Sequence, residues 1–243
     1  MKGIFFSKPL EYNLDIDGEV WTQGSYIKGS LMVSNHSNLA ISLNNIGCHL
    51  CYSSSKKFKS KDPKSINLIE STLLQEGKTK LDFEFKLKNN CPITESTGTL
   101  IIICGDISKP FEGGFLELNI KPMNPIIYLT ETFEMFYRFK VKPFKNKKDF
   151  IEAPIKAPDS KEWASIQKMA LQFKMVTDEL EIKFIVTLKR LSFDDSPHKT
   201  KDEKKEIIKI LTKKEYELYG SANQEGIKKI LDEVMSEIKI KPL

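Results

Sequence analysis

Apolar and polar residues alternate in short runs along the first 145 residues of the chain. The stretch Gly18–Ser34 shows this pattern after a polar turn around Gly24. One phase holds Tyr26, Lys28, Ser30 and Met32, and the other holds Ile27, Gly29, Leu31 and Val33. Alternation with a period of two after a glycine turn predicts a β-strand in a two-faced sheet.

The segments on either side extend this prediction. Pro9 separates two short apolar segments, Lys2–Phe6 and Leu10–Ile16, which we expect to form an edge strand followed by a second strand. Alternation without a miss over Leu81–Lys88 predicts another strand, and the continuous apolar run Gly98–Cys104 predicts a central strand buried on both faces. Further strands are expected at Leu39–Tyr52, with a bulge at Asn44–Asn45, and at Ile66–Leu74, Phe115–Ile120 and Thr132–Val141.

These strands follow one another at intervals of roughly ten to twenty residues, with no helical pattern between them. Such a series predicts an antiparallel β-sandwich of the immunoglobulin-like type over residues 1–145. Residues 146–160 are rich in proline and lysine, which indicates an extended linker.

Residues 161–243 are expected to form a smaller C-terminal portion. A short helix is predicted over Trp163–Met169, a β-hairpin over residues 171–191, and helices at about 203–219 and 224–239, although Ile208 and Ile210 also suit a strand. An apolar stripe at helical spacing from Ile227 to Ile238 supports the last helix. The chain is therefore predicted to be mostly β.

Composition and charge narrow the class of protein. Of the 243 residues, 40% are hydrophobic and 29% are charged, as in an ordinary protein with a buried core. The net charge of +5 is too small for a nucleic-acid footprint, so no nucleic-acid partner is expected. The apolar run Ile4–Phe6 is too short for a signal peptide, and Leu100–Cys104 is too short to cross a bilayer. We expect a cytoplasmic protein, and four scattered cysteines agree with a reducing compartment.

The strongest candidate for a metal site is a Cys-x-x-Cys pair with a histidine inside it, formed by Cys48, His49 and Cys51. Residues three apart in a strand face opposite sides of a sheet, so the two sulfurs should not converge. Cysteines in a strand core are the simpler interpretation. Neither a metal nor another cofactor is expected.

No local pattern of catalytic residues is found. His36, His49 and His198 are scattered, and none lies in a pattern with a serine or cysteine and an orienting carboxylate. We therefore do not expect an enzyme, although a triad can assemble across a fold. A deep pocket lined by His49, with a carboxylate and a Cys or Ser within hydrogen-bond reach, would favour an enzyme.

Two lysine-rich segments are candidates for contact with an anionic surface. A solvated loop is the simpler interpretation, but each segment contains one isolated aromatic residue, Phe58 or Phe144, which keeps a peripheral membrane protein as an alternative. The candidate contact residues are Lys56, Lys57, Lys59, Lys61, Lys145, Lys147 and Lys148.

With the strands placed, three motifs resemble the arrestin-like family. They are the glycine-containing strand segment Gly24–Val33, the turn and alternating strand of Leu73–Phe85, and the loop Cys91–Ser96, which lacks the second proline of the family pattern. Their order and spacing agree with that family over about residues 10–145. The resemblance implies an N-terminal arrestin-like β-sandwich. Relatives of this kind include bacterial sporulation-control arrestin-like proteins and arrestin-like subunits of endosomal sorting complexes.

The resemblance weakens in the second half. An arrestin-like protein is expected to carry a second sandwich of similar size, whereas only about 85 residues follow the predicted linker. Nothing matches the phosphate-sensing lysines or the buried charged cluster of the visual and beta-arrestins, so recognition of a phosphorylated receptor is not implied.

The resemblance implies a non-catalytic adaptor or scaffold that binds a protein or peptide, in trafficking or in signalling regulation. Edge strands of a sandwich can accept an extended peptide by strand addition, and Lys2–Phe6 and Leu10–Ile16 are the candidate edges. The alternatives are a peripheral membrane protein that binds through basic loops and an enzyme whose site is assembled from several loops.

Overall fold

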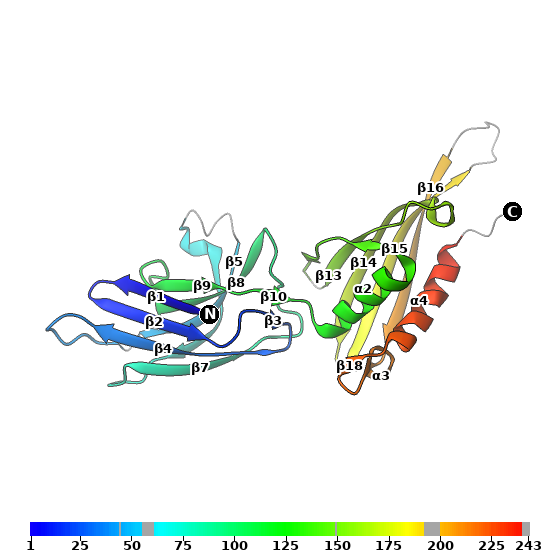
Figure 1. The fold of residues 1–243 in the computed structure, drawn as a ribbon. Coiled ribbons are helices and arrows are strands. Elements are labelled where there is room, and N and C mark those ends of the chain that lie inside the picture. The colour runs from blue at the N-terminus through cyan, green and yellow to red at the C-terminus, as the bar shows by residue number, and fades with distance from the viewer. Residues whose placement is uncertain (44, 55–60, 149, 192–199, 240–243) are drawn as a thin grey trace. The chain divides into compact units, whose positions relative to one another are not determined.

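A computed structural model of the chain describes residues 1–43, 45–54, 61–148, 150–191 and 200–239. The chain divides into two compact units, Met1–Lys121 and Pro122–Leu243 (Figure 1).

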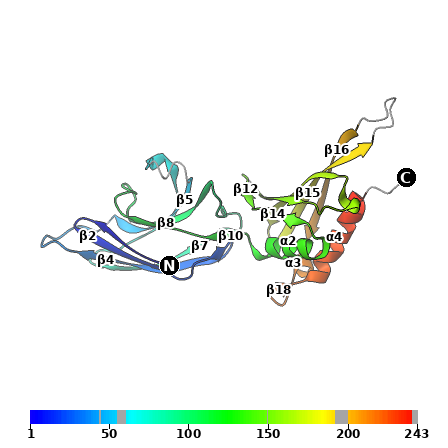
Figure 2. The ribbon, with the colours of Figure 1, turned by 45° about the horizontal axis from the view of Figure 1, so that its top comes forward.

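The first unit is a β-sandwich of two four-stranded antiparallel sheets (Figures 1 and 2). The first sheet has the order β1-β2-β4-β7 and consists of β1 (Lys2–Ser7), β2 (Leu10–Ile16), β4 (Tyr26–Asn35) and β7 (Lys80–Lys86). The second has the order β6-β5-β8-β9 and consists of β6 (Ile66–Leu73), β5 (Ile46–Ser54), β8 (Gly98–Asp106) and β9 (Gly114–Glu117). The unit is completed by a short parallel pair, β3 (Trp21–Thr22) and β10 (Ile120–Lys121), and by the 3₁₀-helix η1 (Pro63–Ser65).

One cluster of buried residues joins the inner faces of the two sheets. The first sheet contributes one phase of each alternating strand, as the sequence pattern predicted for β4 and β7. The cluster includes Ile27, Leu31 and Val33 from β4 and Leu81, Phe83 and Phe85 from β7. The central strand β8 is buried on both faces, as predicted, because Ile101 and Ile103 lie in a second, smaller cluster.

The second unit packs helices against a six-stranded antiparallel sheet of the order β11-β13-β14-β15-β16, with β12 beside β13. The strands are β11 (Lys140–Val141), β12 (Lys145–Asn146), β13 (Ile151–Lys156), β14 (Ile166–Val176), β15 (Glu179–Leu191) and β16 (Thr200–Leu211). The helices α2 (Asn124–Tyr137) and α4 (Gln224–Ile238) lie on the same face of this sheet (Figures 1 and 2). The short elements are η2 (Lys161–Trp163), α3 (Lys213–Tyr216), β17 (Glu217–Leu218) and β18 (Ser221–Ala222).

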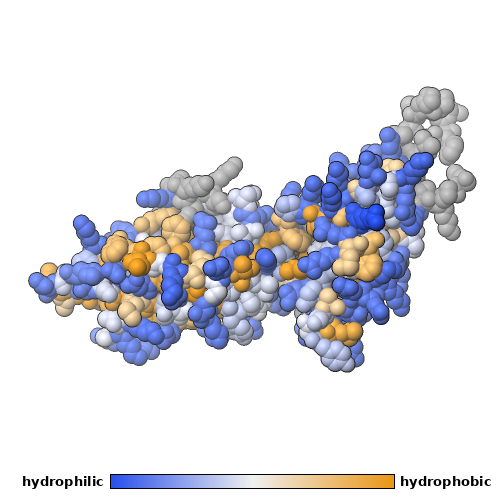
Figure 3. All heavy atoms as spheres, in the orientation of Figure 1, coloured by the Kyte–Doolittle hydropathy of each residue, from blue (hydrophilic) through white to orange (hydrophobic). Residues whose placement is uncertain are grey.

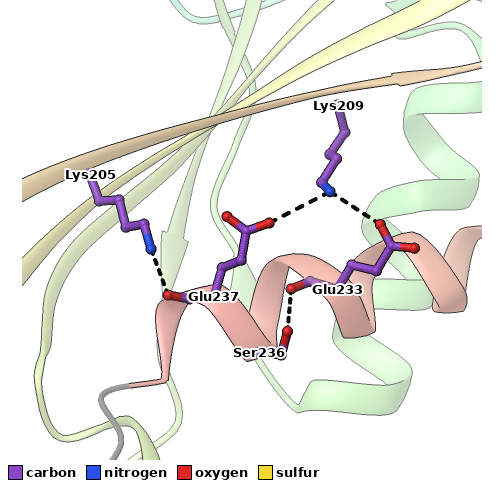
Figure 4. A network of polar contacts seen from close by, with 5 residues as sticks. All are labelled: Lys205, Lys209, Glu233, Ser236 and Glu237. Atoms are coloured by element: carbon purple, nitrogen blue, oxygen red, sulfur yellow. Dashed lines mark hydrogen bonds and ion pairs between the residues drawn. The ribbon is translucent and has the colours of Figure 1, made fainter.

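The predicted C-terminal helix is confirmed as α4. Its apolar stripe is buried: Ile227, Ile230, Leu231, Val234, Met235 and Ile238. Two lysines of β16 hold its C-terminal half (Figure 4). Lys209 Nζ lies 3.1 Å from the Glu233 carboxylate and 3.6 Å from that of Glu237, and Lys205 donates to the carbonyl oxygen of Glu237 at 2.7 Å. Cations near a helix C-terminus also complement the helix dipole.

The predicted unit boundary at residue 145 is wrong, because the strand expected at Thr132–Val141 lies mostly in α2. Pro125 stands in the first turn of this helix, where a proline is favourable. The buried residues Ile126, Leu129, Thr130 and Phe133 then follow helical spacing. The predicted linker 146–160 is wrong as well, since β13 is part of the sheet, and the second unit is as long as the first.

Other boundaries also differ from the prediction. The expected helix Trp163–Met169 is replaced by η2 and the start of β14, and the expected helix at 203–219 is replaced by β16 and α3. The β-branched pair Ile207 and Ile208 suits a strand, where these residues face opposite sides. The strand expected from Leu39 begins only at Ile46, and Asn44 lies outside the described residues. The predicted hairpin at 171–191 is confirmed by the pairing of β14 with β15.

Candidate functional site

The edge strand β1 carries the most exposed apolar residues of the first sheet. Ile4 is 62% exposed and Phe6 is 67% exposed. They lie on the outer face of the sheet, where the register places them beside Asn13 and Glu11 of β2. Hydrophobic surface lies among hydrophilic residues over this part of the first unit (Figure 3). The prediction that Lys2–Phe6 forms an edge strand is confirmed.

Hydrogen bonds at the start of β1 show which of its backbone groups are used inside the sheet. The Ile16 N–H donates to the Met1 carbonyl oxygen at 2.7 Å, and the Met1 amino group donates to the Ile16 carbonyl oxygen at 2.5 Å. In an antiparallel ladder, pairs that exchange two hydrogen bonds alternate with pairs that exchange none. Counting from Met1, the residues of β1 that bond to β2 are therefore Gly3, Phe5 and Ser7.

The residues between them, Lys2, Ile4 and Phe6, turn their N–H and C=O groups toward the open side of β1. No described strand pairs with them there. The outward backbone groups thus belong to the same residues as the outward side chains. A free edge of this kind is a template for one more strand.

The inner side of β1 is closed by one aromatic ring. Phe5 lies so close to Gly114 of β9 that a Cβ on this glycine would fall 1.9 Å from the ring. The same ring covers Gly3, where a Cβ would lie 2.6 Å from it. Only glycine at position 114 allows Phe5 to hold β1 against the second sheet.

The opposite edge of the first sheet, β7, has the same geometry and different chemistry. The Val33 N–H donates to the Thr79 carbonyl oxygen at 2.8 Å, and the Leu87 N–H donates to the Ser25 carbonyl oxygen at 2.9 Å. By alternation, the outward backbone groups of β7 belong to Lys80, Asp82, Glu84 and Lys86, which are all exposed. Charged side chains along an edge strand oppose pairing with another chain.

The edges of the second sheet are less regular than β1. β6 exposes Leu68, Ile69 and Leu73, but its register with β5 shifts between Leu50 and Cys51. β9 has only four residues. Among the four edges of the two sheets of the first unit, β1 is therefore the one that combines an unbroken register with exposed apolar side chains.

The prediction that Leu10–Ile16 is also an edge is wrong. This segment forms β2, which pairs with β1 on one side and β4 on the other. The two apolar segments on either side of Pro9 form a hairpin, so only the first of them lies at the edge.

The lysines predicted to contact an anionic surface fall in both units. Lys56, Lys57 and Lys59 lie outside the described residues, as does Phe58. Lys61 belongs to the first unit, and Lys145, Lys147 and Lys148 belong to the second. Phe144 is half-buried, with its ring centroid 6.5 Å from that of Phe173, and Lys147 lies 3.9 Å from Glu152. Within the described part of the chain, no helix has the length and apolarity to cross a bilayer.

The cysteines of the Cys-x-x-Cys pair face opposite sides of their sheet, as the strand geometry predicted. Cys48 lies in the cluster between the sheets, next to Cys104 across the ladder, whereas Cys51 lies in the smaller cluster. Burial raises the pKa of the Cys51 thiol to about 12. Among the described residues, no group of three or more His, Cys, Asp and Glu side chains could hold a metal ion.

His49 is buried, and both of its ring nitrogens have partners. Nε2 lies 3.0 Å from the Gly105 carbonyl oxygen, which can only accept, so Nε2 carries the proton. Nδ1 then accepts a hydrogen bond from the Ser71 hydroxyl at 2.8 Å. Burial lowers the pKa of His49, so the ring stays neutral.

This contact places a serine beside a base, which the sequence pattern did not suggest because Ser71 is 22 residues away. The register between β5 and β6 brings the two residues opposite each other. The partner of the second ring nitrogen is a backbone carbonyl, and the ring has no exposed surface. The contact therefore differs from a Ser-His-carboxylate triad and attaches the edge strand β6 to β5. His36 is paired with Glu11 at 2.8 Å, and His198 lies outside the described residues.

Neither a family model nor a curated protein matches the sequence. Among solved structures, the chain is similar to Spo0M, a sporulation control protein from Bacillus subtilis, with a TM-score of 0.63 and 14% sequence identity. The match covers 94% of this chain and 98% of the Spo0M chain. The three motifs noted in the sequence lie in this architecture at β4, at the connection from β6 to β7, and in the loop before β8. The resemblance found in the sequence is thus confirmed at the level of the fold, which is arrestin-like and combines an N-terminal antiparallel β-sandwich with a C-terminal sheet and helices.

Proposed function

We propose that the chain is a non-catalytic adaptor that binds an extended segment of a protein partner along β1. The observation that carries this proposal is the coincidence at Ile4 and Phe6 of outward backbone groups and exposed apolar side chains. In strand addition, backbone hydrogen bonds supply affinity, and alternate side chains supply selectivity.

A regulatory role in signalling or trafficking fits this mode of binding. The similar solved structure is that of a sporulation control protein, which supports regulation rather than metabolism. An adaptor also needs reversible contacts. Covering two partly exposed apolar side chains contributes about 2–4 kcal/mol, and each added hydrogen bond contributes about 0.5–1.5 kcal/mol. Against the cost of ordering the partner, these terms suit a weak and reversible contact.

A proline scan of both edges of the first sheet tests the proposal. Ile4→Pro removes an outward N–H from β1, whereas the matched control Asp82→Pro removes an outward N–H from β7. Neither substitution removes a bond inside the sheet, so both variants should keep the fold. Each is panned against a phage-displayed library of random peptides, alongside the unchanged chain.

We expect peptides enriched on the unchanged chain to bind Asp82→Pro equally well and to lose binding to Ile4→Pro. Circular dichroism and thermal unfolding check that both variants are folded. Peptides that bind Ile4→Pro as well as they bind the unchanged chain, or a library that yields no peptide protecting the amides of β1 from hydrogen exchange, would contradict the proposal.

A further inference from the structure

Resting on the proposed function, we infer that the partner segment runs antiparallel to β1 with two apolar residues, two positions apart, followed two positions later by a carboxylate. An added strand is expected to run antiparallel because every strand pair of this sheet is antiparallel and such pairing is the more stable per residue. The residue pattern then follows from the order of the three outward residues, which are Phe6, Ile4 and Lys2 when read against the direction of the chain.

The hydrogen-bonding pattern fixes which partner residues face these three. Because Lys2, Ile4 and Phe6 turn their backbone groups outward, an added antiparallel strand forms its hydrogen-bonded pairs with them. Paired residues in a ladder project their side chains to the same face. Three alternate side chains of the partner therefore lie on the outer face of the sheet, each beside one of these residues.

Two of the three outward residues of β1 are apolar. Phe6 and Ile4 are both more exposed than any other large apolar residue of the first sheet. An apolar side chain beside each removes this surface from water, whereas a charged side chain there would lose solvent without gaining a partner.

The partner residue that faces Lys2 is expected to be acidic. Its ammonium lies 2.8 Å from Asp15, and its side chain is 80% exposed. An ammonium has three donors, so Lys2 can bind a partner carboxylate while it keeps Asp15. Glu11, the other carboxylate on this side of β2, lies beside Phe6 at the far end of β1. The partner carboxylate would thus lie next to Lys2 and away from Glu11.

The two intervening partner residues face the inner side, beside Gly3 and Phe5. The Phe5 ring fills this side, since it covers Gly3 and lies against Gly114. Small side chains suit these positions, and serine is used there in the test.

The probe is the blocked synthetic peptide Ac-Ser-Val-Ser-Ile-Ser-Glu-Ser-NH2, in which Val, Ile and Glu face Phe6, Ile4 and Lys2. Three further peptides replace Glu by Lys, replace both apolar residues by Ser, or reverse the sequence. Their affinities for the full chain and for the Lys2→Glu variant are measured by NMR titration or fluorescence anisotropy. Ile4→Pro serves as the control that lacks an outward N–H.

Exposed cross-strand charge pairs are weak, so we expect the Glu peptide to bind the unchanged chain about fivefold more tightly than the Lys peptide. Lys2→Glu should reverse this order. The peptide without apolar residues and the reversed peptide should bind more weakly than the Glu peptide.

Equal affinities for the Glu and Lys peptides, with binding still lost in Ile4→Pro, would overturn the selectivity and leave strand addition standing. Tighter binding of the reversed peptide would overturn the antiparallel direction. Failure of all four peptides to bind would overturn the inferred pattern, while the library experiment decides the proposed function on its own.

Discussion

The two edge strands of the first sheet, β1 and β7, share one backbone geometry but differ in the chemistry of their exposed side chains. In β1 and β7 alike, the residues with outward backbone groups also present their side chains on the outer face. β7 places a charge at each such position, whereas β1 places Ile4 and Phe6 after a single lysine. A sheet that protects one edge with charge and leaves the other apolar has an edge suited to pairing.

The inner sides of these edges differ as well. β7 is anchored by Leu81, Phe83 and Phe85, which are all buried. β1 turns Gly3, Phe5 and Ser7 inward, and all three are half-buried. The charged edge strand β7 is thus packed through three buried side chains, whereas the apolar edge strand β1 is packed mainly through the Phe5 ring.

The largest effect is expected when the inward-facing aromatic side chain of each edge strand is truncated to alanine. Phe85→Ala should lower the free energy of unfolding by about 3–5 kcal/mol, because the side chain is fully buried and leaves a cavity. Phe5→Ala, at a half-buried position, should cost about 1–2 kcal/mol. Urea unfolding measures both. Equal losses would show that the two edges are anchored alike.

A second test gives β7 the chemistry of β1. The double variant Asp82→Ile, Glu84→Ile removes the ion pairs of these residues with Lys80 and Lys28, each worth about 0–1 kcal/mol at such exposed positions. It also creates a second apolar edge, so we expect concentration-dependent association in analytical ultracentrifugation. A variant that stays monomeric at every concentration would show that charge is not what protects β7.

The reciprocal change gives β1 the charges of β7. Ile4→Lys with Phe6→Lys should change the free energy of unfolding by no more than about 0.5 kcal/mol, because both side chains are exposed. Binding of the library-selected peptides should be lost. A large loss of stability in thermal unfolding would mean that these residues serve the fold rather than a partner.

The smallest expected effect is a pH dependence near β1. A hydrogen bond with His36, and then one from Asn13, lowers the pKa of Glu11 below its ordinary value. A carboxylate with a lowered pKa in the folded state adds stability above its unfolded pKa, and this contribution is lost as the pH falls through the folded pKa. The midpoint of thermal unfolding should therefore fall slightly more between pH 6 and pH 3 in the unchanged chain than in Glu11→Gln. Parallel curves for the two proteins would rule out this contribution.

Much of the first unit could be predicted from the sequence because its strands are patterned. Alternation placed β4 and β7, and a continuous apolar run placed the doubly buried β8. The helix α2 was missed because Phe133 and Tyr137 fit both a strand period and a helical one, and Pro125 resembles an interruption as much as a helix start.

The candidate site could be predicted only in outline. The run Ile4-Phe5-Phe6 indicates a strand but not which side chain is buried, because all three are apolar. That choice depends on the register with β2 and on the contact of Phe5 with Gly114, a residue distant in the sequence. The contact between His49 and Ser71 could not be predicted either, because it also depends on the register between two strands.

The position of Phe5 over Gly114 has one more consequence for any bound segment. A segment shifted along β1 by a single residue would project its apolar side chains to the inner side, where the Phe5 ring already fills the space. Its small residues would then lie beside Ile4 and Phe6 and leave them in water. If a segment binds along β1 as proposed, the edge would therefore disfavour a misaligned segment, because the Phe5 ring on Gly114 already occupies the inner side.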